Sequence, residues 1–164
     1  DVNVVTFARW EEGLMVRAGN PKGIRSIADV ARSDIRLINR ETGAGARILL
    51  DQRLSAAGIV AKSVKGYEQL ASSHFHVARL IAESQDDVGV GVRFAADYYG
   101  LDFLSLQEAR YDLVMPTAYL SIHPALQSFF DTIVTRQFRG EVEALGGYDT
   151  KETGKVQQLH LGED

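Results

Sequence analysis

The stretch Asn39–Arg47, which reads NRETGAGAR, has the composition of an anion-binding turn. Its glycine-bearing part, Thr42-Gly43-Ala44-Gly45, connects the apolar run Ile35–Ile38 to a helical pattern. The first N–H groups of a helix lack intrahelical partners, and the helix dipole adds partial positive charge there. Arg40 and Arg47 stand on either side of the turn and can add forked, charge-assisted contacts. The chemistry that these residues indicate is non-covalent binding of an oxyanion.

The glycine turn differs from the familiar nucleotide-binding loops. A P-loop continues with Lys and then Ser or Thr after its last glycine, whereas Ala46-Arg47 follows Gly45. A dinucleotide fingerprint requires a third Gly or Ala where Ile48 stands. Two interpretations stay open: Gly43 and Gly45 only tighten the turn, or they keep its backbone accessible to an anion.

A second helix start supplies further donors. Ser72 or Ser73 can cap a helix that continues through Ile81, so Ser73 and His74 would lie at its N-terminus. His74 and His76 also suggest a metal site. However, helical residues two apart face different directions, and no Cys or third clustered ligand supports them. Packing or surface placement is the interpretation of the two histidines that the spacing favours.

Other reactive arrangements have little support in the sequence. The adjacent acids Asp86-Asp87 precede a strand, where neighbouring side chains more often point in opposite directions than form an acid–base pair. No Gly-x-Ser-x-Gly elbow is present to hold a nucleophile. Arg93 is open to two interpretations, as a solvated helix start or as a residue reaching a ligand cleft. We therefore expect no enzymatic activity, metal or cofactor.

The composition sets further bounds on function. The chain has 164 residues, 45% apolar and 24% charged, which suits one domain or two small lobes. A net charge of −4 argues against a nucleic-acid surface in this segment. The absence of cysteine excludes disulfides and thiolate metal sites. No apolar run approaches the roughly 20 residues that span a bilayer, so we expect no membrane partner.

Apolar runs alternate with helical periods, which predicts an α/β fold with a mostly parallel sheet and a ligand at the carboxyl ends of its strands. The expected strands are Val2–Phe7, Leu14–Val16, Ile35–Ile38, Val60–Tyr67, Val88–Val92, Leu101–Leu106 and Tyr111–Met115. Residues 35–38 and 88–92 are expected to be central strands. The expected helices are a short one capped by Ser26 and Asp29, one from Ala44 to Ala57, one from Ser73, one at Phe94–Tyr99 and a long one from Pro124.

Several segments, in order, cover nearly the whole chain: ARWEEGLMVRAGNPKGI, INRETGAGARILLD, GYEQLASSHFHVARLIAESQDDVGVGVRFAADYYGLDFLSL, EARYDLVMP and LGGYD. Together they resemble the periplasmic-binding-protein-like domain of molybdate-responsive regulators and of fusions with molybdopterin-biosynthesis proteins. The resemblance implies two α/β lobes with a molybdate- or tungstate-like oxyanion between them. The second lobe would span about 14–100. An incomplete first lobe with the crossover would comprise about 1–13 and 101–164.

The resemblance also implies the ligand contacts. It places the ligand loop at Asn39–Arg47 and a second contact at Ser73-His74, where the family usually has Thr-His. The family loop commonly reads Gly-Ser-Gly-Thr-Arg, so Ala44 and Ala46 remove two hydroxyl donors, which favours a different ligand or a degenerate site. The expected ligand-binding residues are Asn39, Arg40, Thr42, Gly43, Ala44, Gly45, Ala46, Arg47, Ser73 and His74.

The hypothesis that follows is a non-enzymatic sensor or substrate-binding domain of a larger cytoplasmic regulator, which contacts DNA only through a domain outside this sequence. Two alternatives stay open: the substrate-binding component of an anion transporter, and an interaction module that has lost ligand binding. An incomplete first lobe would expose a strand edge and the apolar face of the last helix, at Phe129, Phe130 and Ile133. We therefore also expect a homo-oligomer, such as a dimer.

Overall fold

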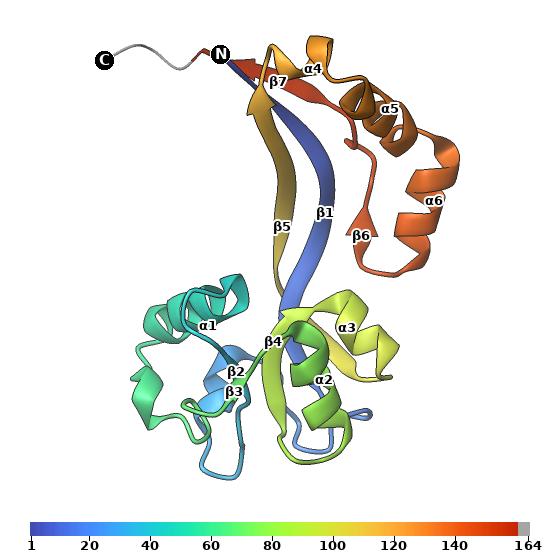
Figure 1. Ribbon diagram of the computed structural model, residues 1–164. Coiled ribbons are helices and arrows are strands. Elements are labelled where there is room, and N and C mark those ends of the chain that lie inside the picture. The colour runs from blue at the N-terminus through green and yellow to red at the C-terminus, as the bar shows by residue number, and fades with distance from the viewer. Residues whose placement is uncertain (161–164) are drawn as a thin grey trace. The chain divides into compact units, whose positions relative to one another are not determined.

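The computed structural model describes residues 1–160, which divide into two compact units (Figure 1). The central unit comprises Glu11–Gln107. The terminal unit comprises Asp1–Trp10 and the segment that begins at Glu108. Two 15-residue strands, β1 (Val2–Val16) and β5 (Asp102–Pro116), contribute residues to both units. The sequence placed the corresponding divisions at about residues 13 and 100.

The sheet of the central unit is built around a buried strand, β4 (Val88–Val92), in which all five residues are buried. β4 pairs antiparallel with β1, from Glu12 opposite Val92 to Val16 opposite Val88. It also forms a parallel bridge from Val88 to Leu37. Just beyond that bridge, β2 (Asn39–Arg40) pairs in parallel with β3 (Leu70–Ala71). The prediction of a buried central strand at 88–92 is confirmed.

Helices cover this sheet and bury its apolar side chains. They are the 3-10 helices η1 (Ile27–Ala31) and η2 (Ala61–Ser63) and the α-helices α1 (Gly45–Ala56), α2 (His74–Ala82) and α3 (Arg93–Tyr98). Ser26 and Asp29 form the predicted capping box of η1. Leu50 and Leu54 of α1 are fully buried, as the predicted apolar stripe requires, whereas Ala57 is exposed.

The terminal unit contains the N-terminal half of β1 and the C-terminal elements. β1 pairs antiparallel with β6 (Tyr148–Asp149) and with β7 (Val156–Leu159). Three helices follow β5, namely α4 (Tyr119–Ile122), α5 (Pro124–Ile133) and α6 (Arg136–Ala144). Pro124 occupies the first turn of α5, as predicted. Thr135 caps α6 by accepting a hydrogen bond from the Phe138 N–H, so the chain forms two helices where one long helix was expected.

The α/β class, with a sheet flanked by helices, is confirmed, but the expected strand direction holds only in part. Parallel pairing joins β2 to β3 and Leu37 to Val88, whereas β1 runs antiparallel to β4, β6 and β7. Parallel strands need a long crossover between them. The helices α1 and α2 supply such crossovers among β2, β3 and β4, while β1 precedes both helices.

The predicted strands differ from the structure in four places. β1 is not interrupted at residues 9–13, because Gly13 allows a close strand approach in which an added Cβ would collide with the Leu104 carbonyl oxygen. Similarly, 102–106 and 111–115 belong to the single strand β5, which begins at Asp102. Residues 60–67 form η2 and turns, with hydrogen bonds such as Ser63 N–H to the Val60 carbonyl at 2.9 Å. At 35–38, only Leu37 forms a bridge.

Candidate functional site

Two helix N-termini follow neighbouring parallel strands of the central unit. Asn39 lies opposite Leu70 and Arg40 opposite Ala71, so β2 and β3 end at the same edge of their small sheet. β2 leads through residues 41–44 into α1, and β3 leads through Ser72 and Ser73 into α2. Ligands in open α/β sheets bind beyond the carboxyl ends of the strands. This arrangement brings the two groups of predicted ligand residues, 39–47 and 73–74, to one edge.

The turn before α1 leaves its backbone open. Gly43 has a φ of 91°, a left-handed conformation that favours glycine. Ala44 is the N-cap without a side-chain cap, and its carbonyl accepts from the N–H groups of Arg47 and Ile48, both at 3.0 Å. The N–H groups of Gly45 and Ala46 belong to the first turn, which has no helical acceptors for them. A Cβ added to Gly45 would meet nothing within 4 Å. Neither backbone conformation nor packing therefore requires glycine at 45.

The Arg40 guanidinium forms a forked ion pair with Glu41. Its Nε and Nη2 donate to Glu41 Oε2 and Oε1, both at 2.8 Å. The Arg40 side chain is only 12% exposed, and that of Glu41 is 48% exposed. The Arg40 charge and hydrogen bonds lower the pKa of the Glu41 carboxyl to about 2. Thr42, which follows, is exposed.

The Arg47 side chain connects the turn before α1 to the rest of the central unit. Its guanidinium carbon lies 4.1 Å from the centre of the Tyr67 ring, and its Nε lies 3.1 Å from Asp51 Oδ2. Its Nη1 donates to the Arg40 carbonyl at 3.2 Å. Tyr67 in turn donates its hydroxyl to Asp51 at 2.7 Å. The expected contact of Arg47 with an anion stays a prediction, and the contacts that are formed position the turn.

Asn39 is buried, and both ends of its side-chain amide have partners. Nδ2 donates to the Tyr67 carbonyl at 3.0 Å, and Oδ1 accepts from the Arg40 N–H at 2.9 Å. The Asn39 backbone N–H donates to the Gln69 carbonyl at 2.9 Å. Asn39 therefore connects β2 to the segment before β3 and fixes the edge at which the two helices begin.

The start of α2 is capped as predicted. Ser73 is the N-cap, and its hydroxyl oxygen accepts from the His76 N–H at 3.0 Å. The first helical residue is His74, whose buried Nδ1 has no hydrogen-bond partner within residues 1–160. Burial lowers the pKa of His74, and the Arg40 charge lowers it further, against opposing effects of Glu12 and Glu41. The imidazole is therefore neutral near pH 7. It lies close enough to the end of β2 for the charges of Arg40 and Glu41 to affect its pKa.

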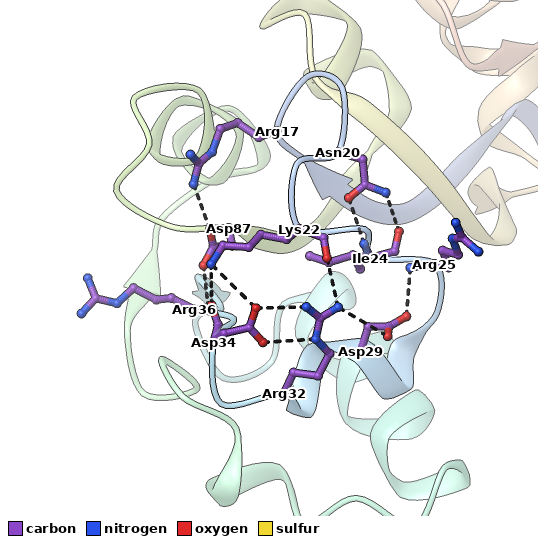
Figure 2. A network of polar contacts seen from close by, with 10 residues as sticks. All are labelled: Arg17, Asn20, Lys22, Ile24, Arg25, Asp29, Arg32, Asp34, Arg36 and Asp87. Carbon is purple, nitrogen blue, oxygen red and sulfur yellow. Dashed lines mark hydrogen bonds and ion pairs between the residues drawn. The ribbon is translucent and has the colours of Figure 1, made fainter.

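Most of the remaining candidates have structural partners, but the buried Asp86 Oδ1 has none among residues 1–160. Within residues 1–160, no cluster of three His, Cys, Asp or Glu side chains could hold a metal ion. His76 Nδ1 lies 3.3 Å from the Ser72 hydroxyl. Asp87 accepts from Arg17 at 2.8 Å in the ion-pair network of Figure 2. Arg93 is the first residue of α3, as one of the two interpretations expected, and its side chain is 32% exposed. It pairs with Glu11 and stacks over Phe103.

Sequence reasoning missed three residues that shape the site. Asp51 lies four residues after Arg47, a spacing that favours an ion pair on a helix and that could have indicated the contact. Glu41 is adjacent to Arg40 and could have been considered as its partner. Tyr67 comes from a segment that was expected to be a strand, and no local pattern connects it to Arg47.

Residues 1–134 match the PBP superfamily domain, and the chain belongs to this superfamily. The uncharacterized protein YvgK of Bacillus subtilis (strain 168) is 37% identical over 144 residues, which are 88% of this chain and 46% of YvgK. The chain thus spans about half the length of this curated relative. The superfamily match over residues 1–134 confirms the periplasmic-binding-protein-like part of the expected family.

Solved structures with this fold include three proteins that are named for sulfate, phosphate or molybdenum. The sulfate-binding protein SubI of Mycobacterium tuberculosis H37Rv has a TM-score of 0.63 and 18% identity, covering 88% of this chain and 57% of its own. A substrate-binding protein assigned to a phosphate ABC transporter of Clostridium perfringens, solved with bound phosphate, has a TM-score of 0.62 and 14% identity. The match covers 95% of this chain and 72% of that protein. A substrate-binding domain assigned to a molybdenum ABC transporter of Clostridium difficile has a TM-score of 0.62 and 13% identity. The match covers 89% of this chain and 66% of that domain. At these identities the likeness shows the fold alone.

No helix within residues 1–160 combines the length and the apolar character that a membrane crossing requires.

Proposed function

We propose that this chain binds a small tetrahedral oxyanion at the N-termini of α1 and α2, as the ligand-binding domain of a larger protein. The observation that carries the proposal is the open Gly45. It begins a helix beside a second helix start, although neither its conformation nor its packing requires glycine. Such a residue is explained when a ligand approaches the backbone closely. The fold relatives named for sulfate, phosphate and molybdenum support an inorganic oxyanion.

The donors are mainly backbone groups. The N–H groups of Gly43, Gly45 and Ala46 would bind from α1, and those of the first turn of α2 would bind from the other side. The Arg40 fork and the exposed Thr42 hydroxyl add side-chain donors. The Ala46 side chain packs in the core cluster, so alanine there removes no donor from the exposed face of the turn. Ala44 is partly exposed, and a hydroxyl at that position would strengthen the site.

The role that we propose for binding is sensing. An oxyanion that binds one conformation better than another shifts the population, and a partner domain reads the shift. Two rivals predict different results. A transport component would release its ligand to a permease, and a degenerate module would bind no oxyanion.

Calorimetry with molybdate, tungstate, sulfate and phosphate tests the proposal. We expect wild type to bind at least one of them, and Gly45→Ala to bind it at least about tenfold more weakly, because the added methyl lies where the ligand approaches. The matched control is Gly140→Ala on α6, where an added Cβ also meets nothing within 4 Å. It should leave binding unchanged. Lack of binding by wild type at millimolar oxyanion would favour the degenerate module.

A further inference from the structure

The proposed site contains an anion that belongs to the protein itself. The Glu41 carboxylate is held in a forked pair by Arg40, with both N···O distances at 2.8 Å. Glu41 directly follows β2 and precedes the glycine turn, so its charge lies at the edge where α1 and α2 begin. It also acts electrostatically on His74, the first residue of α2. A negative group is thus already stabilised at the place where the oxyanion is expected.

The two members of this pair differ in how firmly they are held. The Arg40 N–H donates to Asn39 Oδ1 at 2.9 Å, and its carbonyl accepts from Arg47 Nη1 at 3.2 Å. The Arg40 side chain is largely covered, whereas about half of the Glu41 side chain is exposed. The Glu41 carboxylate can therefore rotate into solvent more readily than the covered Arg40 side chain can. The lowered pKa of Glu41 keeps the carboxylate ionised at neutral pH.

We propose that Glu41 is an internal counter-anion, which an incoming oxyanion must displace from Arg40. This inference rests on the proposed oxyanion site. When the Glu41 carboxylate is displaced, it regains hydration by water but loses its forked, charge-assisted hydrogen bonds to Arg40. The contacts of the ligand with Arg40 therefore have to be stronger than the contacts of Glu41 that they replace. A tetrahedral dianion brings two charges to the Arg40 fork and the helix N-termini. A tetrahedral monoanion brings only the single charge that Glu41 already provides, so its net gain is small.

Tungstate and perrhenate are suitable probes, because they are similar in shape and differ in charge. Calorimetry on wild type should show tungstate binding and no measurable perrhenate binding. In Glu41→Gln, which keeps the shape of the side chain, tungstate should bind about tenfold more tightly, and perrhenate binding should become measurable. If Glu41 only orients Arg40, the change in affinity has the opposite sign, and Glu41→Gln binds tungstate more weakly than wild type does.

The control is Asp34→Asn, which removes the same charge from another forked pair of the central unit. Asp34 accepts from Arg32 Nε at 3.1 Å and Nη2 at 3.0 Å, on the turn before Leu37. The Asp34→Asn substitution should leave the affinities for tungstate and perrhenate unchanged. Unchanged or weaker tungstate binding in Glu41→Gln overturns the counter-anion while the oxyanion site stands. If neither wild type nor Glu41→Gln binds tungstate, the oxyanion site and the counter-anion proposal are both overturned. If only Glu41→Gln binds tungstate, both proposals are supported.

Discussion

The two units differ in how completely they bury their apolar side chains. In the central unit, one continuous cluster extends from Leu14 on β1 through Leu50 on α1 to Val88 on β4. In the terminal unit, the buried apolar side chains among the described residues are Val5, Ala8 and Ile133. Buried polar side chains such as Thr150 and Thr153 accompany them. The candidate site thus lies on the unit that has a complete core, which can hold backbone donors in fixed positions.

The terminal unit instead presents apolar surface. No residue of β5 is buried. Val114, Tyr119, Ile122 and Phe129 are among its exposed large side chains. A groove of about 440 Å³ is lined by Leu113, Val114, Met115, Pro116, Tyr119, Leu126, Phe129 and Phe130. Apolar surface of this kind is typical of a region that another chain segment or subunit covers. The central unit thus buries a continuous apolar cluster, whereas the terminal unit leaves much of its apolar surface exposed.

The largest expected effect is on stability in the central unit. Leu54 is fully buried, so Leu54→Ala should lower the free energy of unfolding by about 2–5 kcal/mol. The comparison is Val114→Ala on β5, where the side chain is 64% exposed and the expected change is within about 0.5 kcal/mol. Urea unfolding followed by circular dichroism measures both. Equal losses would show that the contrast in burial does not extend to stability.

The next effect concerns association. We expect self-association at micromolar concentration through the β5 edge and through Phe129 and Phe130 of α5, which line the groove. Ile133, which was expected on the same uncovered face, is fully buried. Val114→Lys should shift the chain toward monomer in sedimentation velocity. The control is Val60→Lys, since Val60 in the central unit is 71% exposed and lies outside the groove. A wild type that sediments only as monomer would contradict this expectation.

The smallest effect is a pH dependence in the central unit. Burial lowers the pKa of His74 below 6.5, so the unfolded chain binds a proton at this position at higher pH than the folded chain does. The stabilisation is fully present above pH 6.5 and is lost as pH falls through the lowered folded pKa. His74→Gln should therefore reduce the loss in unfolding free energy between about pH 7 and about pH 5. An unchanged pH slope in urea titrations would exclude this role.

The elements that could be predicted from the sequence are those with local causes. The capping box of Ser26 and Asp29, the Ser73 cap and the apolar stripe of α1 each depend on residues within a few positions. The continuity of β1 depends on a distant contact, where Gly13 accommodates the backbone of Leu104. The local pattern of residues 9–13, which include Gly13, predicted an interruption of the strand. Long-range strand pairing, which local patterns do not encode, determined the outcome.

The site could be predicted as a place but not as a set of contacts. The glycine turn, the helix starts and their neighbouring strands follow from residues 35–47 and 70–74. The partners of the arginines do not, because Arg47 meets the Tyr67 ring from a distant turn. The ion pair of Arg40 with Glu41 depends on rotamers that the fold selects. The direct ligand contacts of Arg40, Arg47 and Ser73 therefore stay predictions.

Amide-resolved NMR during titration with tungstate tests most directly whether the helix starts of the central unit bind an oxyanion. The two-unit comparison predicts the largest saturable shifts at the N–H groups of Gly43, Gly45 and Ala46, with further shifts at His74. Those of Gly140 and Gly147 in the terminal unit should stay near their starting positions. Shifts that are largest in the terminal unit, or absent at residues 43–46 at millimolar tungstate, would contradict an oxyanion site at these helix starts.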